Sequence, residues 1–203
     1  MGFFQKLFGF GDQMFQSDED KLHNVQRVAA ALQKLLAEGT LAQKGDDKLI
    51  VRGKVEGRPL TIELGITFGG FEITVQTSCG APEESMSLAH DSDGARRVPG
   101  AAQEPDGFGD VKEFLSDTIY LEGTPDELAA WKGLLGRLPP ALVRKLLAHL
   151  EAHQARASFS AHEIELSPWK GDVAQRDALD RIRANILLAS ELAAATEAAW
   201  GRN

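Results

Sequence analysis

The sequence predicts an α+β protein in which an antiparallel β-meander is covered by helices and followed by a second β-α-α-β-α unit. Apolar and polar residues alternate along residues 48–77, which is typical of strands that bury only one face. Apolar residues recur every three or four positions along residues 17–39 and 124–150, which indicates helices that cover a core. Two glycine-containing turn signals divide the alternating stretch, so we expect three strands there.

The helix before the meander is predicted to begin at Ser17 and to end at Gly39. The Ser17 side chain suits a helix cap, and the acidic residues after it suit the positive end of the helix dipole. In the meander, Glu63, Glu72 and Thr74 fall on the polar face. Carboxylates buried together can exchange protons, but a solvated sheet face has the same pattern, and we interpret these residues as such a face.

Residues 1–16 are predicted to form an apolar docking segment. The segment holds five of the ten phenylalanines of the chain, and its two internal glycines limit any helix to about two turns. Its side chains need a surface that buries them: the protein's own body, a partner protein or second copy, or a membrane. Acidic residues after the segment repel anionic lipids, so the membrane is the weaker alternative. The candidate partner-binding residues are Phe3, Phe4, Leu7, Phe8, Phe10, Met14 and Phe15.

Residues 78–110 are predicted to be a mobile loop, because they are rich in glycine, proline, serine and acidic residues. The acidic residues of this region are Asp91, Asp93, Asp106 and Asp110. Asp91 begins a run that resembles a calcium loop, but the run lacks the glycine at its sixth position and the glutamate at its twelfth. We therefore interpret the acidic residues as solvating a loop and predict no metal.

The second unit is predicted over residues 111–203. Thr124 provides a helix cap, with proline at the first helical position and Glu127 completing a capping box. Pro139 and Pro140 end this helix and begin the next. The other expected elements are a short helical turn at 111–115, a strand at 117–122, a hairpin or bent strand at 156–167, and a last helix from Asp172 to about residue 199.

The histidines at 149 and 153 are the strongest candidate metal ligands. Four residues apart in a helix, they share one face, and His162 could supply a third ligand. The metalloprotease pattern requires glutamate directly after the first histidine, where this chain has Leu150. We interpret the pair as two solvated histidines near a helix end, where the dipole favours positive charge, and predict no metal and no cofactor.

Composition excludes several classes of function. The formal net charge of −8 opposes nucleic-acid binding, and the basic residues are interleaved with acidic or apolar ones. Cys79, the single cysteine, can form neither an internal disulfide nor a cysteine-based zinc site, and is interpreted as inert. No stretch has the length and apolarity of a membrane span, and no signal-peptide pattern precedes the first helix, so a cytoplasmic location is expected. Alanine, glycine and arginine usage is typical of a GC-rich bacterial genome.

The expected function is therefore non-enzymatic. No nucleophile elbow, Walker loop or dinucleotide fingerprint occurs in the chain. We expect a protein-binding adaptor, chaperone-like or regulatory protein of the bacterial cytoplasm, whose partner is another protein or a second copy of itself. Two alternatives stay open: a peripheral membrane protein anchored by residues 1–16, and an enzyme of unrecognised type.

Overall fold

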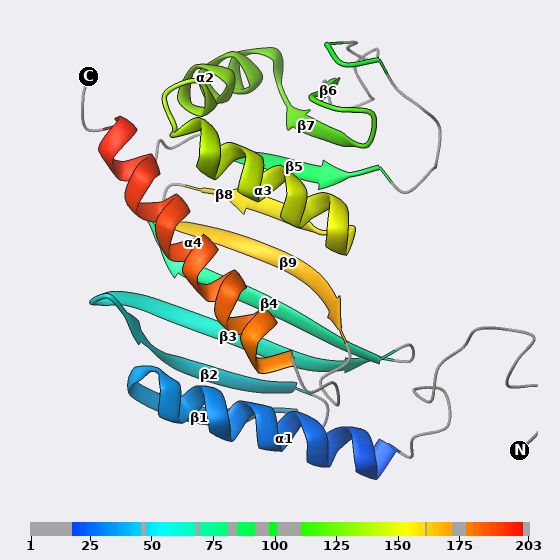
Figure 1. Cartoon of the computed structure of the whole chain (residues 1–203), viewed down its shortest axis with the longest axis vertical. Helices are drawn as coiled ribbons and strands as arrows, with labels where there is room; N and C mark the ends of the chain where they lie inside the picture. The colour runs from blue at the N-terminus through cyan, green and yellow to red at the C-terminus, as the bar shows by residue number, and fades with distance from the viewer. Residues whose placement is uncertain are drawn as a thin grey trace, which may run out of the picture.

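The computed structural model describes residues 18–45, 48–67, 70–80, 85–91, 98–100, 111–160, 162–171 and 178–200. These residues form an α+β fold with a nine-stranded antiparallel sheet in the order β1-β2-β3-β4-β9-β8-β5-β7-β6 (Figure 1). The strands are β1 (Ala37–Lys44), β2 (Lys48–Val55), β3 (Arg58–Thr67), β4 (Gly70–Ser78), β5 (Met86–His90), β6 (Val111–Phe114), β7 (Ile119–Gly123), β8 (Arg156–Phe159) and β9 (Glu163–Gly171). The helices are α1 (Asp18–Leu35), α2 (Pro125–Leu135), α3 (Pro140–His153) and α4 (Ala178–Trp200).

The meander has four strands, because β1 precedes the three that periodicity predicts. The prediction that α1 ends at Gly39 is wrong: the helix ends at Leu35, and β1 pairs antiparallel with β2. Gly39 has a packing role instead, since a Cβ atom built there would collide with the carbonyl oxygen of Gln33. Gln33 Nε2 also donates a hydrogen bond of 3.3 Å to the Gly39 carbonyl oxygen. Only glycine lets β1 turn back so closely beneath α1.

The two predicted units share one sheet. Strand β4 of the meander pairs antiparallel with β9, with Gln76 opposite Glu165. The hairpin predicted in the second unit is confirmed as β8 and β9. One hydrophobic core therefore runs from α1 to α4 beneath a continuous sheet.

Two predictions about the middle of the chain are wrong. The loop predicted over residues 78–110 contains β5, which lies between β8 and β7 and buries Met86 and Leu88. The helical turn predicted at 111–115 is β6, which pairs with β7. Both strands are too short for periodicity to reveal, and pairing with distant strands decides their conformation.

The helix signals of the second unit are confirmed. Thr124 caps α2, its side chain accepts a hydrogen bond from the backbone of Glu127, and the Glu127 carboxylate accepts one from the Thr124 backbone. Helix α3 follows directly after Pro139. The structure describes α4 from Ala178 onward, so its predicted beginning at Asp172 lies outside the described residues.

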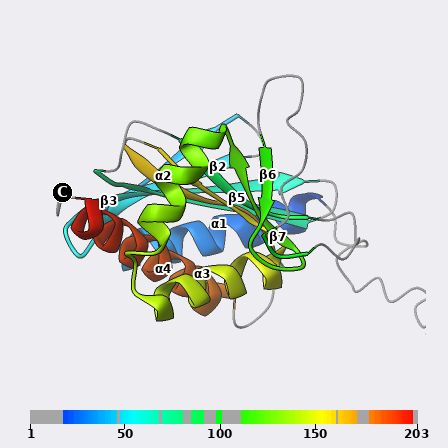
Figure 2. The same ribbon diagram turned by 90° about the horizontal axis from the view of Figure 1, so that it is seen from above.

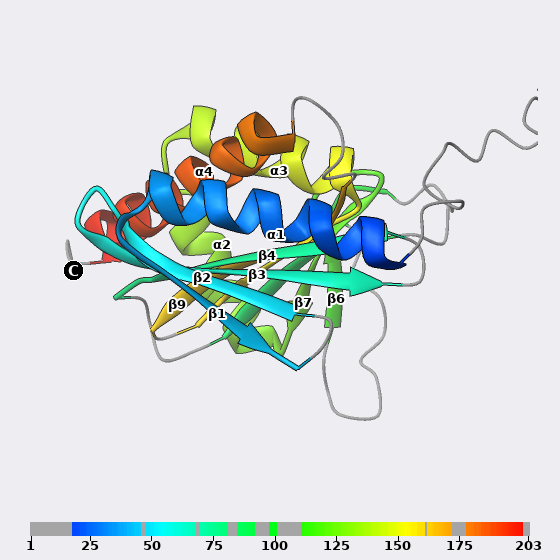
Figure 3. The same ribbon diagram turned by 90° about the horizontal axis from the view of Figure 1, so that it is seen from below.

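The described helices gather on one face of the strongly twisted sheet (Figures 2 and 3). Helix α1 packs on β1, β2 and β3, α4 packs on β4 and β9, and α2 and α3 pack on β5 and β7. The other face is mostly polar, and Glu63 lies opposite Thr74 there, as predicted. Near the β6 edge this face also carries a small buried apolar cluster of Ala89, Phe114 and Tyr120. One polar row crosses all nine strands through paired positions: Thr40, Arg52, Thr61, Gln76, Glu165, Ser158, Ser87, Glu122 and Lys112.

Candidate functional site: a groove between α3 and α4

A groove of about 680 Å³ opens between α3 and α4, next to the turn that joins β2 to β3. Its floor is apolar, because Leu142 of α3 and Ala194 and Ala195 of α4 line it. Short alanine side chains on α4 leave the space that a larger residue would fill. Its remaining lining residues are Glu56, Pro139, Ala141, Lys145, Ser190 and Glu191.

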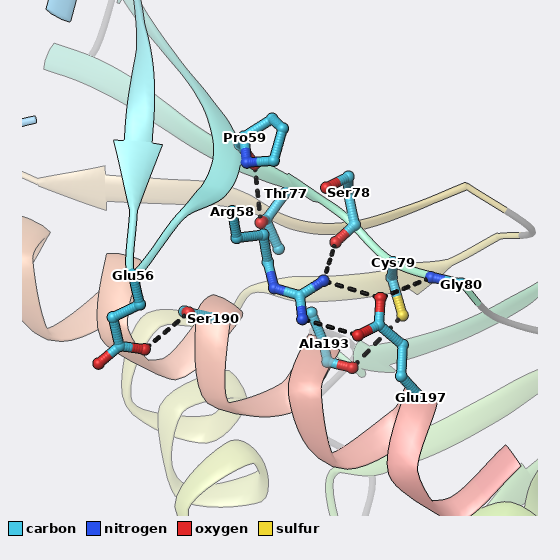
Figure 4. A network of polar contacts seen from close by, with 10 residues as sticks. All are labelled: Glu56, Arg58, Pro59, Thr77, Ser78, Cys79, Gly80, Ser190, Ala193 and Glu197. Atoms are coloured by element: carbon cyan, nitrogen blue, oxygen red, sulfur yellow. Dashed lines mark hydrogen bonds and ion pairs between the residues drawn. The ribbon is translucent and has the colours of Figure 1, made fainter. Parts of the chain in front are cut away.

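The β2–β3 turn places one carboxylate at the groove. Glu56 and Gly57 form a two-residue hairpin loop, and both have a positive φ, of 52° and 80°. This conformation matches the twist of the flanking strands, and glycine adopts it without strain. Figure 4 shows the Glu56 side chain reaching α4, where Ser190 Oγ lies 3.3 Å from a Glu56 carboxylate oxygen and donates to it.

An ion pair joins the two helices that border the groove. Lys145 Nζ of α3 lies 2.8 Å from Glu191 Oε2 of α4. The two helices run antiparallel (Figure 1). Farther along them, burial, followed by the Arg181 cation, lowers the pKa of His153. The groove is therefore bordered by carboxylates from the turn and from α4 and by an ammonium group from α3.

Behind the groove, an arginine–carboxylate pair joins α4 to the sheet. Arg58 donates two hydrogen bonds to the Glu197 carboxylate, at 2.8 and 2.7 Å, and a third to the carbonyl oxygen of Ser78 at 2.8 Å (Figure 4). The backbone N–H of Gly80 also donates to Glu197, at 2.9 Å. The hydrogen bond from Arg58 is the main reason that the pKa of Glu197 lies below its usual range. This network holds α4, and with it one wall of the groove, against β3 and β4.

Cys79 lies beside this network and is buried. Its Sγ is 3.7 Å from the carbonyl oxygen of Ala193 in α4. Burial, followed by the Glu197 carboxylate, raises the pKa of the thiol to about 11. A thiol that stays protonated at neutral pH is a weak nucleophile.

We expect Glu197→Gln to lower the free energy of unfolding by about 1 to 2 kcal/mol, because it replaces a charged bidentate acceptor for a guanidinium that is only 19% exposed. Glu191→Gln is the matched control. Its ion pair with Lys145 is about half exposed, so we expect a loss of about 0.5 kcal/mol or less. Urea unfolding of both variants measures the difference, and equal losses would contradict a special role for the Arg58 pair.

The same network has a pH dependence. Because the folded pKa of Glu197 is depressed, its stabilisation is fully present above the ordinary glutamate pKa and is lost as the pH falls through the folded value. Glu197→Gln should therefore differ least from the parent protein at acidic pH.

The histidine pair at the end of α3 differs from its predicted environment. The rings of His149 and His153 are 4.8 Å apart between centroids, so the shared face is confirmed. The interpretation as two solvated, positively charged histidines is wrong for His149, which is only 9% exposed. Burial, followed by the charge of His153, lowers the pKa of His149 to about 4, so it is neutral at pH 7. His162 is exposed and lies just before β9.

Within the described ranges, no group of three or more His, Cys, Asp or Glu side chains is arranged to hold a metal ion. The described helices include none that is both long enough and apolar enough to cross a membrane.

The predicted partner-binding residues all belong to residues 1–16, outside the described part of the chain. Of the acidic loop residues, only Asp91 is described. The groove residues were not singled out from the sequence, because Leu142, Lys145 and Ala194 have the ordinary pattern of amphipathic helices. The only signal was the alanine-rich end of α4, where small side chains leave room at a helix surface.

Neither a protein-family model, nor a curated protein, nor a solved structure matches this chain. The class of protein is therefore defined by the fold itself: an α+β protein whose nine-stranded antiparallel sheet is covered by helices on one face.

Proposed function

We propose that this protein is a non-enzymatic adaptor of the bacterial cytoplasm, with a chaperone-like or regulatory role, that binds a segment of another protein in the α3–α4 groove. The observation that carries the proposal is the groove itself, a hollow of about 680 Å³ with an apolar floor and charged borders. An apolar centre surrounded by polar groups is the usual composition of a protein-binding surface.

The borders of the groove indicate the chemistry of the partner. Glu56 and Glu191 contribute carboxylates, and Lys145 already pairs with Glu191. The apolar face of α4 continues past the groove, because Leu187 lies on the same helix face as Glu191 and Ala194 and is exposed. The partner segment that fits is amphipathic, with apolar side chains against Leu187 and Ala194 and a basic side chain beside Glu56.

The pKa values of His149 and Cys79 support binding rather than catalysis. General acid–base chemistry is most efficient when a group has a pKa near the working pH. The pKa of His149 is displaced to about 4 by burial, and that of Cys79 to about 11. These displacements leave both groups neutral at pH 7 and follow mainly from packing in the core.

The proposal is tested by filling the groove. Ala194 is exposed and lines it, so Ala194→Trp would occupy the space that a partner needs. Ala129, exposed on α2 and absent from the groove lining, provides the matched control Ala129→Trp. A protein captured from native lysate by the parent chain should be retained by the control and lost from the groove variant. With that partner purified, we expect the affinity to fall at least tenfold for Ala194→Trp.

Equal capture by the parent chain and Ala194→Trp would contradict the groove as the binding site. A chain without residues 1–16 tests the second expected contact, the phenylalanine-rich segment, separately from the groove. If the shortened chain and Ala194→Trp both lose the same partner, the segment and the groove form a joint site. If only the shortened chain loses it, the binding site is the segment. Flotation of the shortened and full chains with neutral and anionic liposomes tests the membrane alternative.

A further inference from the structure

The first half of α4 carries apolar side chains that are exposed. Among the described residues, five large apolar side chains are exposed, and two of them belong to this helix: Leu179, at 39%, and Leu187, at 41%. Arg183 lies midway between them and is also exposed. Because residues four positions apart follow one another along a helix surface, the three side chains form one ridge about 12 Å long. We call Leu179, Arg183 and Leu187 the α4 ridge.

The α4 ridge begins on the side of α4 that faces α1. An α-helix completes about five turns in 18 residues, so Leu179 lies on the same side of α4 as Glu197. Glu197 pairs with Arg58 of β3. Helix α1 packs on β1, β2 and β3, so this side of α4 is the one directed toward α1.

The starts of α1 and α4 lie at the same end of the sheet. Helix α1 begins at Asp18 and is about as long as β1, which runs back beneath it and ends at Lys44. From Lys44, a row of paired residues crosses the sheet and reaches Lys170, near the end of β9. Helix α4 is described from Ala178, a few residues after β9. Figure 1 shows the dark blue start of α1 and the orange start of α4 toward the same side of the sheet.

Residues 1–16 are joined to this end of α1, and they hold five of the ten phenylalanines. Helix α1 packs over β1 to β3 and α4 over β4 and β9, so two to three strand spacings, roughly 10–15 Å, separate the two helix starts. The nine residues from Gly9 to Ser17 reach up to about 30 Å when extended. The phenylalanines that precede them are therefore within reach of the whole α4 ridge.

We propose that residues 1–16 dock on the α4 ridge of their own chain. The phenylalanine rings cover Leu179 and Leu187, and apolar surface on both partners is removed from water. An aromatic ring also attracts the Arg183 guanidinium to its face, which an aliphatic side chain does not. The short connection to α1 gives the segment an effective concentration in the millimolar range at the ridge. A contact too weak to hold two separate molecules together therefore holds this segment.

The docking does not depend on the function proposed for the α3–α4 groove. The groove lining on α4 begins at Ser190, about one turn beyond Leu187. If the proposed function holds, a partner segment in the groove lies beside the docked phenylalanines. Residues 1–16 then contact the partner from a fixed position on α4.

Photo-crosslinking tests where the segment lies. The photoreactive amino acid benzoylphenylalanine replaces Phe4 or Phe8 in the full chain, and it bonds under near-ultraviolet light to groups that it contacts. We expect a crosslink within one chain to residues 179–187, and the mass of the product separates it from a bond between two chains. Leu187→Glu should abolish the crosslink, because a carboxylate would lose its water beneath the rings. Leu35→Glu is the matched control: Leu35 is 42% exposed and lies at the other end of α1.

Proteolysis measures how completely the segment is docked. Chymotrypsin cleaves after phenylalanine, and a segment docked about nine-tenths of the time is cleaved about tenfold more slowly than a free one. We expect release of the N-terminal residues, followed by mass spectrometry, to be about tenfold faster in Leu179→Glu and Leu187→Glu than in the parent chain. The rate for Leu35→Glu should equal that of the parent. Thermal unfolding of each variant checks that α4 stays folded.

Two results would overturn the proposal. One is the absence of a crosslink to the α4 ridge within one chain, whether the product is missing, joins two chains or maps to another surface. The other is chymotrypsin cleavage at the same rate in the parent chain, both ridge variants and Leu35→Glu, because docking on the ridge requires that only the ridge variants release the segment.

Discussion

Trp131→Ala is expected to lower the free energy of unfolding by about 3 to 5 kcal/mol. Trp131 is only 1% exposed and packs against Phe159, with ring centroids 5.2 Å apart. It joins α2 to the centre of the sheet, because Phe159 belongs to β8. Removal of the indole leaves a cavity that the surrounding strand and helix can only partly fill. Differential scanning calorimetry should show a melting temperature lower by about 10 °C or more.

Trp131→Phe is the informative control for this change. Among the described residues, the buried Trp131 Nε1 has no hydrogen-bond partner, and an unpaired buried donor costs about 1 to 3 kcal/mol. Phenylalanine removes this donor while keeping most of the ring, so we expect a loss of about 1 kcal/mol or less. A loss as large as that of alanine would indicate that the indole N–H does have a partner in solution.

The second large effect is a loss of stability as the pH falls from about 6.5 to about 4. Burial, with a contribution from His153, lowers the pKa of His149 to about 4 in the folded protein, whereas an unfolded histidine titrates near 6.5. Between these pH values the unfolded state binds a proton that the folded state does not, so the free energy of unfolding decreases as the pH decreases. The full pKa shift of His149 corresponds to a loss of roughly 3 kcal/mol in the free energy of unfolding. This loss is absent above pH 6.5 and complete below pH 4.

His149→Phe should remove this part of the pH dependence, because its ring fills the same place and does not titrate. Urea unfolding at several pH values between 7 and 4 measures the slope for each protein. His162→Gln is the control, since His162 is exposed. Carboxylates also contribute to acid unfolding. The test is therefore the difference between the two variants in the slope of the free energy of unfolding against pH. Equal slopes would mean that His149 is accessible to protons in the folded protein.

Local sequence signals were sufficient to predict several helices and strands. Strict alternation predicted β3, and the turn residues Glu56 and Gly57 predicted the hairpin before it. The capping box of Thr124 and Glu127 predicted the start of α2. These elements follow from hydrogen bonds and side-chain periodicity within a few residues, which the sequence contains completely.

The candidate site depends on contacts that no local pattern contains. Arg58 and Glu197 are 139 positions apart, and their pairing appears only when α4 packs across the sheet. The groove requires the β2–β3 turn, the start of α3 and the end of α4 to meet. The predicted environment of His149 was wrong for the same reason, because its burial in the folded chain outweighs the effect of its place near a helix end.

The sequence by itself determined the α+β class, the helix-forming stripes, the strands of the meander and the polar character of one sheet face, because periodicity and turn chemistry act between neighbours. Only the tertiary structure decided that the two units share one sheet, that β5 and β6 are strands, and that β1 is the edge strand of the sheet that the described residues form. Those outcomes depend on hydrogen bonds between distant strands and on the side chains that distant helices bury.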